Sequence, residues 1–158
     1  MTLFRLTLVV LAAFLVDQGT KALALASLTQ GDPVPLLPGL ALTLGFNEGA
    51  SFGMLSGVMA GRPLGMIALT GAITLVLVIL AYRSTRPIEA VGLALISGGS
   101  FGNIADRLRQ GSVTDFIDVF WRDWHWPTFN LADVAISCGT VLILLAALQP
   151  TKGKRANA

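Results

Sequence analysis

Long apolar runs are the feature that most limits how this chain folds. Four stretches, at residues 3–25, 64–82, 88–105 and 131–148, are each long enough and apolar enough to cross a bilayer as a helix. Only 13% of the residues are charged, against about 25% in soluble domains. We therefore predict an all-α membrane protein with four transmembrane helices, forming a single domain over residues 1–158.

The segment between the first two runs, residues 27–62, has a different pattern. Prolines at positions 33, 35 and 38 exclude a long helix there. Leucines alternate with small residues over positions 40–44, which is typical of a short strand. We expect a small strand-containing extramembrane element after the first helix.

The first apolar run carries two ionisable residues, Asp17 and Lys21. They are four residues apart and share one helix face, with the acid before the base, which is the favourable order. A cleavable signal peptide has a shorter apolar region, so we expect residues 3–25 to be retained as a transmembrane helix. The pair is either a structural ion pair inside the membrane or part of a functional site.

Basic residues indicate the orientation of the chain. They occur near the N-terminus, in the loop between the second and third runs, and in the tail at residues 149–158. These three places lie on the same side of a four-span protein, and the positive-inside rule makes that side cytoplasmic. The segments at residues 27–62 and 106–130 are then outer loops.

In this topology, polar residues that are far apart in the sequence collect at the outer side. They are Asp17, Lys21, Asn47, Asn103, Asp106, Arg107, Asp115, Asn130 and Asp133. Placing a charge at the centre of a bilayer costs at least about 2.5 kcal/mol, and a stable helix bundle does not need so many at one face. This concentration indicates a functional site.

Two of these acids, Asp115 and Asp133, are candidates for a catalytic pair. Asp133 follows Asn130, a good N-cap residue, by three positions, so it falls in the first turn of the last helix, where the helix dipole favours a carboxylate. Asp115 is flanked by apolar residues, and burial raises the pKa of a carboxyl. Two carboxyls that share a proton can activate water and protonate a peptide carbonyl.

Other kinds of chemistry find little support. The one histidine, His125, and the one cysteine, Cys138, cannot form a usual zinc site, and no serine or cysteine has an evident base. We therefore expect neither a metal nor another cofactor. The net charge of +2 comes from scattered residues, so no nucleic-acid partner is expected.

Five short blocks occur in order along the chain: DQGTK at 17–21, FNEGASFG at 46–53, GGSFGNIADR at 98–107, GSVTDF at 111–116 and FNLAD at 129–133. Together they resemble the lipoprotein signal peptidase family, also called signal peptidase II or prolipoprotein signal peptidase. The resemblance covers nearly the whole chain. Ser51 occupies a position where the family often has alanine, which we take as tolerated.

The resemblance implies a bacterial inner-membrane aspartic endopeptidase with both termini in the cytoplasm and its active site near the outer face. Such enzymes remove the signal peptide from diacylglyceryl-modified prolipoproteins by cutting before the lipidated cysteine, and globomycin-type inhibitors target them. The family's catalytic pair falls on Asp115 and Asp133. Its polar supporting residues fall on Asp17, Lys21, Asn47, Asn103, Asp106, Arg107 and Asn130. The chain looks sufficient as a monomer among membrane lipid.

Two other function classes compete with the peptidase. A small proton-coupled transporter would use intramembrane Asp and Lys, but it should show inverted repeats and polar groups near the midplane, and the sequence shows no internal repeat. A structural scaffold that binds partners through its outer loops would not need two acids in apolar settings.

Several residues also have structural interpretations. Asn103 could cap the end of the third helix, and Arg107 could anchor at lipid headgroups. Asp118 and Asp123 are expected to be solvated loop acids, and Cys138 to lie in the core. The glycines at 98, 99 and 102 favour close helix packing, and the tryptophans at 121, 124 and 126 favour an aromatic belt at the membrane interface.

Overall fold

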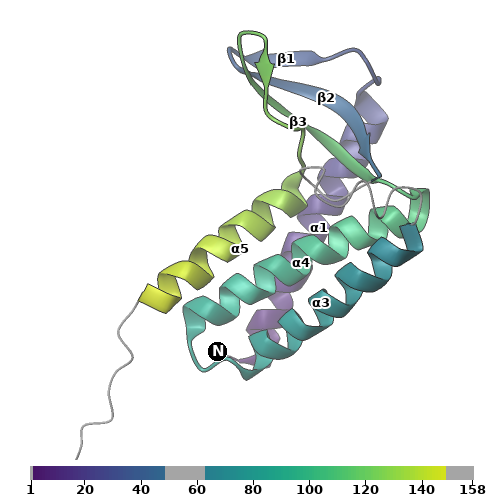
Figure 1. The fold of residues 1–158 in the computed structure, drawn as a ribbon. Helices are drawn as coiled ribbons and strands as arrows, with labels where there is room; N and C mark the ends of the chain where they lie inside the picture. Colours follow the sequence, from purple (N-terminus) through teal and green to yellow (C-terminus); the bar gives the residue numbers. More distant parts are fainter. Residues whose placement is uncertain (1, 49–62, 149–158) are drawn as a thin grey trace, which may run out of the picture.

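The computed structural model describes residues 2–48 and 63–148. This part of the chain contains four long helices: α1 (Leu3–Ser27), α3 (Pro63–Arg83), α4 (Pro87–Gln110) and α5 (Leu131–Leu148). Each is long and apolar enough to cross a membrane. Figure 1 shows α4 between α3 and α5, with α1 behind them. The predicted fold class is confirmed, while the second half of the outer loop, residues 49–62, and the tail at 149–158 lie outside the described residues.

The third helix is longer than the sequence predicted. It continues five residues past position 105 and ends at Gln110. The C-cap is Gly111, whose φ of 81° is left-handed and whose N–H donates to the Arg107 carbonyl at 3.0 Å. This is the usual glycine C-cap. Asp106 and Arg107 are therefore helical residues instead of loop residues, and Asn103 does not cap a helix end.

Small residues bring the helices close together, as predicted. A Cβ atom added at Gly98 would lie 2.6 Å from the Val10 carbonyl oxygen of α1, and one at Gly99 would lie 2.5 Å from the Ala132 carbonyl oxygen of α5. Larger side chains at these positions would force the backbones apart. Because α4 contacts all three other helices, this packing fixes where its polar end lies relative to theirs.

A four-stranded antiparallel sheet lies at one end of the bundle (Figure 1), in the order β1 (Val34–Leu37), β2 (Leu40–Asn47), β3 (Val113–Trp121) and β4 (Trp124–His125). The strand predicted over positions 40–44 is confirmed within β2. The interpretation of residues 106–130 as loop was wrong, because this segment supplies β3 and β4. The first half of β3 is buried on both faces, so it lacks the alternation of a half-exposed strand.

The chain then returns along β3 to the start of α5. The Phe129 carbonyl accepts hydrogen bonds from the N–H groups of Phe116 and Ile117 at 3.0 and 2.9 Å, and the Phe129 N–H donates to the Ile117 carbonyl at 3.1 Å. This bridge places Asn130, and with it the first turn of α5, beside the middle of β3.

Candidate active site

Asp115 lies on β3, with amide side chains from two other segments at its carboxylate. Strand pairing puts Gly45 opposite Asp115 and Asn47 opposite Val113, so the Asn47 side chain lies diagonally across from Asp115 on the same face. Asn47 Nδ2 donates to Asp115 Oδ2 at 3.2 Å, and Asn130 Nδ2 donates to Oδ1 at 2.6 Å. The Asp115 residue is only 3% exposed.

Asp133 lies in the first turn of α5, as the spacing from Asn130 predicted. The Asp133 N–H donates to Asn130 Oδ1 at 3.0 Å, and the Asn130 N–H donates to Asp133 Oδ2 at 3.3 Å. This is the reciprocal pattern of a capping box, which satisfies N–H groups that a helix start leaves free. Because its Oδ1 is engaged with Asp133, the Asn130 amide must turn its Nδ2 toward Asp115. One side chain therefore connects the two acids.

Asn103 fixes the other Asp133 oxygen. Its Nδ2 donates to Asp133 Oδ1 at 3.1 Å, while its Oδ1 accepts from Lys21 Nζ at 2.8 Å. An ammonium group only donates hydrogen bonds, so Lys21 determines which end of the amide faces Asp133. The Asn103 interpretation as a supporting residue agrees with this geometry.

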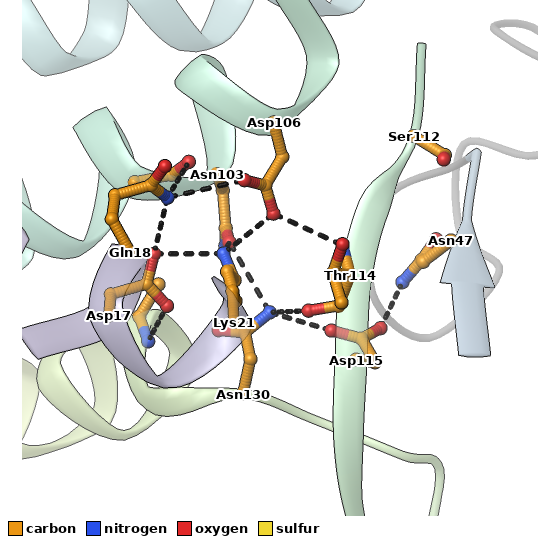
Figure 2. A network of polar contacts seen from close by, with 12 residues as sticks. Asp17, Gln18, Lys21, Asn47, Asn103, Asp106, Ser112, Thr114, Asp115 and Asn130 are labelled. Carbon is orange, nitrogen blue, oxygen red and sulfur yellow. Dashed lines mark hydrogen bonds and ion pairs between the residues drawn. The ribbon is translucent and has the colours of Figure 1, made fainter. Parts of the chain in front are cut away.

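Lys21 is the centre of a buried network that joins α1, α4, α5 and β3 (Figure 2). Its Nζ lies 2.9 Å from Asp17 Oδ2 and 3.0 Å from Asp106 Oδ2. Asp17 Oδ1 also accepts from the Ala132 N–H at 2.9 Å, and Asp106 Oδ2 accepts from the Thr114 N–H at 3.1 Å. The ion pair predicted from four-residue spacing is thus also an anchor for the first turn of α5 and for the residue before Asp115.

Three residues of this network were missed by the sequence reasoning: Gln18, Arg109 and Thr114. Gln18 Nε2 donates to Asp17 Oδ2 at 3.0 Å and to Asp106 Oδ1 at 3.2 Å, and its Oε1 accepts from Arg109. Arg109 is three residues after Asp106 on one helix face, a spacing that signals an ion pair. Gln18 lies inside the block at 17–21, but only the tertiary arrangement reveals its partners.

Arg107 is buried, with 8% exposure, so the headgroup interpretation was wrong. Its positive charge lies within electrostatic range of Asp115, Asp133 and Asp106. In the described part of the cluster, four carboxyl groups thus face two buried cations, and Lys21 already contacts two of the four. The charge of Lys21 also acts on Asp115 and Asp133, and Arg107 is the second buried cation near this pair.

The environment of Asp115 changes its acidity. Burial, and then the nearby charge of Asp133, raise the pKa of the Asp115 carboxyl from its ordinary value of 3.8 to about 6, although the bonds from Asn47 and Asn130 oppose the rise. A carboxyl with such a pKa can hold or release a proton close to neutral pH.

This shift predicts a pH-dependent effect of Asp115→Asn on stability. A carboxyl whose pKa is higher in the folded than in the unfolded state destabilises the fold when ionised, so wild-type stability rises as pH falls through about 6. Between pH 8 and pH 5 this amounts to about 1.4 kcal/mol. Asp115→Asn has no carboxyl to protonate at this position. The free energy of unfolding of the variant, relative to that of wild type, should therefore fall by about that much between pH 8 and pH 5. Thermal unfolding of both proteins in detergent measures it; an unchanged difference between pH 8 and pH 5 would contradict the shift.

A cavity of about 600 Å³ opens beside Asp133, between α3, α4, α5 and the segment before Asn130. Four of the predicted site residues line it: Asn47, Asn103, Arg107 and Asp133. Its other walls are mainly apolar, with Met66 of α3 and Ile136 of α5 among them.

Two further interpretations are corrected by the structure. Asp118 is buried, and its carboxylate lies 2.9 Å from His125 Nδ1, so it is not a solvated loop acid. Cys138 is exposed along the cavity and does not lie in the core. By contrast, Asp123 is exposed, as expected.

Comparison with known proteins gives the same picture as the site. The family model described as Signal peptidase (SPase) II, Peptidase_A8, matches residues 9–149. The chain belongs to the signal peptidase II family. It is therefore an aspartic peptidase, and this membership decides against the transporter and the scaffold.

Relatives and solved structures match this chain over most of its length and of theirs. Lipoprotein signal peptidases of Escherichia fergusonii and of Escherichia coli O157:H7 are each 40% identical over 148 residues, which is 92% of this chain and 90% of theirs. Two solved bacterial membrane enzymes, determined by the in meso method at 2.3 and 1.9 Å resolution, are 28% identical, with TM-scores of 0.83 and 0.82. They cover 99% and 94% of this chain, which covers 94% and 96% of theirs.

Proposed function

We propose that Asp115 and Asp133 are the catalytic pair of this signal peptidase. The observation that carries the assignment is the Asn130 side chain, which bonds to Asp115 through its Nδ2 and to the Asp133 N–H through its Oδ1. A single amide thus holds two acids from different segments next to each other. A bundle stabilised only by its ion pairs has no need for this second pair of carboxyls.

The proposed reaction uses a water molecule between the two carboxyls. The ionised carboxyl takes a proton from the water as its oxygen attacks the scissile carbonyl carbon, and the protonated carboxyl donates its proton to the carbonyl oxygen. Collapse of the tetrahedral intermediate breaks the C–N bond while a proton passes to the leaving nitrogen. The charge of Arg107 favours the form with one proton on the pair over the form with two. The titration belongs to the pair and not to one residue.

The substrate follows from the family. The relatives are lipoprotein signal peptidases, and we infer that this chain removes signal peptides from prolipoproteins by cutting before a diacylglyceryl-modified cysteine. The cavity beside Asp133 supports this, because its mainly apolar walls lie along helices that could span the membrane. Cleavage of a diacylglyceryl-modified lipobox peptide by purified protein, lost in Asp133→Asn, tests enzyme, substrate and site together.

The proposed orientation has both termini in the cytoplasm and the catalytic pair near the outer face of a bacterial inner membrane. The carboxyl ends of α1 and α4 and the start of α5 lie at the sheet end of the bundle (Figure 1), and the exposed Trp121 and Trp124 lie on that sheet. In a Cys138→Ser background, a cysteine at Trp121 should react with an impermeant maleimide added to spheroplasts. Labelling only after lysis would reverse the orientation.

The inhibitor and the assembly state are also proposals. Globomycin-type inhibitors should compete with the lipobox peptide, because a non-hydrolysable peptide would occupy the same cavity beside Asp133. The pair and its supporting residues come from one chain, which supports a monomeric enzyme. Mass determination of the active detergent complex checks this.

A further inference from the structure

Three hydroxyl side chains from three different helices line the cavity: Thr70 of α3, Ser100 of α4 and Ser137 of α5. Ser100 is three residues before Asn103, and Ser137 is four residues after Asp133. Because α4 ends and α5 begins at the sheet end of the bundle (Figure 1), both hydroxyls lie one helical turn, about 5.4 Å, deeper than the residues that hold the catalytic pair. Thr70 lies one turn below Met66, another residue of the cavity wall.

Hydroxyl groups in apolar helices usually bond to their own backbone, four residues earlier. In the helices that the structure describes, six do so, on Thr7, Thr20, Thr70, Thr74, Ser97 and Thr140. Within the described ranges, Ser100 and Ser137 make no such bond and instead border the cavity. Thr70 donates its hydroxyl hydrogen to the Met66 carbonyl at 2.6 Å. Its oxygen can therefore still accept a hydrogen bond, but it has no second hydrogen to donate.

A membrane-bound peptide must be unwound where it is cut, because the backbone of a helix is shielded by its own side chains and hydrogen bonds. Unwound N–H and C=O groups cost several kcal/mol each in an apolar environment unless the protein supplies partners. The residues just before the scissile bond belong to the signal peptide and therefore pass the level immediately below the catalytic pair. That level is where Thr70, Ser100 and Ser137 lie.

We propose that these three residues form a hydroxyl collar that hydrogen-bonds the main chain of the unwound signal peptide just before the scissile bond. Ser100 and Ser137 can donate to a carbonyl or accept from an N–H, and Thr70 accepts from an N–H. The collar binds main-chain atoms, so it accepts varied apolar sequences while it selects peptides that unwind at this depth. The proposal rests on the assignment of Asp115 and Asp133 as the catalytic pair.

The test uses Ser100→Ala, Ser137→Ala and the double variant, with kcat/KM measured on a diacylglyceryl-modified lipobox peptide. Each loss of one hydrogen bond should lower kcat/KM about fivefold, and the double variant about 25-fold. Ser97→Ala is the matched control: Ser97 is on the same helix and fully buried, but it bonds to the Leu93 carbonyl at 2.8 Å and does not line the cavity. Thermal unfolding of each variant checks that the fold is intact.

A second peptide set separates binding of the main chain from a change in cavity shape. In it, an ester replaces one amide at the second, third or fourth position before the cut. At one of these positions the kcat/KM of wild-type enzyme should fall about fivefold, while a variant that combines Thr70→Ala with Ser100→Ala and Ser137→Ala should show no further fall. Equal losses in wild type and variant at all three positions, or wild-type cleavage by the double variant, would overturn the collar. In the same assay, cleavage by Asp133→Asn would overturn the catalytic pair instead.

Discussion

Asp115→Asn and Asp133→Asn should each lower kcat by at least about 10³-fold on a lipobox peptide, with little change in KM. General acid–base catalysis contributes about 10²- to 10⁴-fold, and an amide can neither take a proton from water nor donate one as an acid. Residues that act as a unit give non-additive losses. The double variant should therefore be no slower than the slower single variant.

The fold should survive these changes, because asparagine keeps the shape of aspartate. An Asn at position 133 can still accept from the Asn130 N–H, as Asp133 Oδ2 does at 3.3 Å. Asp118→Asn is a matched control. Asp118 is another buried acid on β3, but its carboxylate contacts His125, whereas that of Asp115 contacts Asn130, so this variant should cleave at close to the wild-type rate.

The test is the cleavage rate of each purified and folded variant. A cleavage rate within tenfold of wild type in either Asp115→Asn or Asp133→Asn would remove that residue from the catalytic pair. A large loss of cleavage in Asp118→Asn as well would mean that the sheet tolerates no change of a buried acid. The losses of cleavage in Asp115→Asn and Asp133→Asn would then not be evidence for a catalytic role.

Hydropathy and short-range spacing were enough to predict part of this arrangement. The apolar runs locate the helices because only long apolar segments are stable in a bilayer. The Asp17–Lys21 pair and the Asn130–Asp133 cap follow from spacings of four and three residues, which are set by helix geometry. All these contacts are local in sequence, so one segment contains both partners.

The parts that could not be predicted depend on tertiary contacts. The first half of β3 is buried on both faces, so its pattern does not distinguish it from an apolar loop. Arg107 looks like a membrane anchor until α4 is known to continue to Gln110 and to turn this side chain toward the acids. The partner of Asp118 is seven residues away, across a turn between strands.

The network around Lys21 shows how local and tertiary information combine. Spacing identifies Asp17 as a partner, but the contacts to Asp106 and Asn103 join residues more than 80 positions apart. The link from Lys21 through Asn103 to Asp133 gives this network a second role, because it holds the amide of Asn103 in the orientation that donates to the acid.

Lys21→Met should therefore be strongly destabilising. Lys21 is 1% exposed, and its ammonium lies within 3.0 Å of both Asp17 and Asp106. Removing the cation leaves two buried carboxylates without their shared positive charge. Breaking a buried ion pair in this way typically lowers the free energy of unfolding by about 3–5 kcal/mol. We expect a large fall in the thermal unfolding temperature in detergent, together with a loss of cleavage because Asn103 loses the shorter of the two bonds that its side-chain oxygen accepts.

Arg109→Met is the matched control, because Arg109 contacts the same Asp106 at 2.8 Å but its side chain is 63% exposed. Exposed pairs contribute about 0–1 kcal/mol and are screened by salt. The Lys21→Met effect should persist at high salt, while any Arg109→Met effect should shrink.

A second substitution identifies the cause of the Lys21→Met effect. If uncompensated charge is responsible, Asp106→Asn in the Lys21→Met background should recover part of the lost stability, because one buried carboxylate is removed while the Thr114 N–H keeps an acceptor. It should not restore cleavage, since the Asn103 side-chain oxygen then keeps only the longer bond from Asn130 Nδ2, at 3.3 Å, in place of the 2.8 Å bond from Lys21. If Lys21→Met unfolded at the same temperature as wild type, the cation would be dispensable for the fold. Recovery of both stability and cleavage in the double variant would show that Lys21 only neutralises Asp106 and does not orient Asn103.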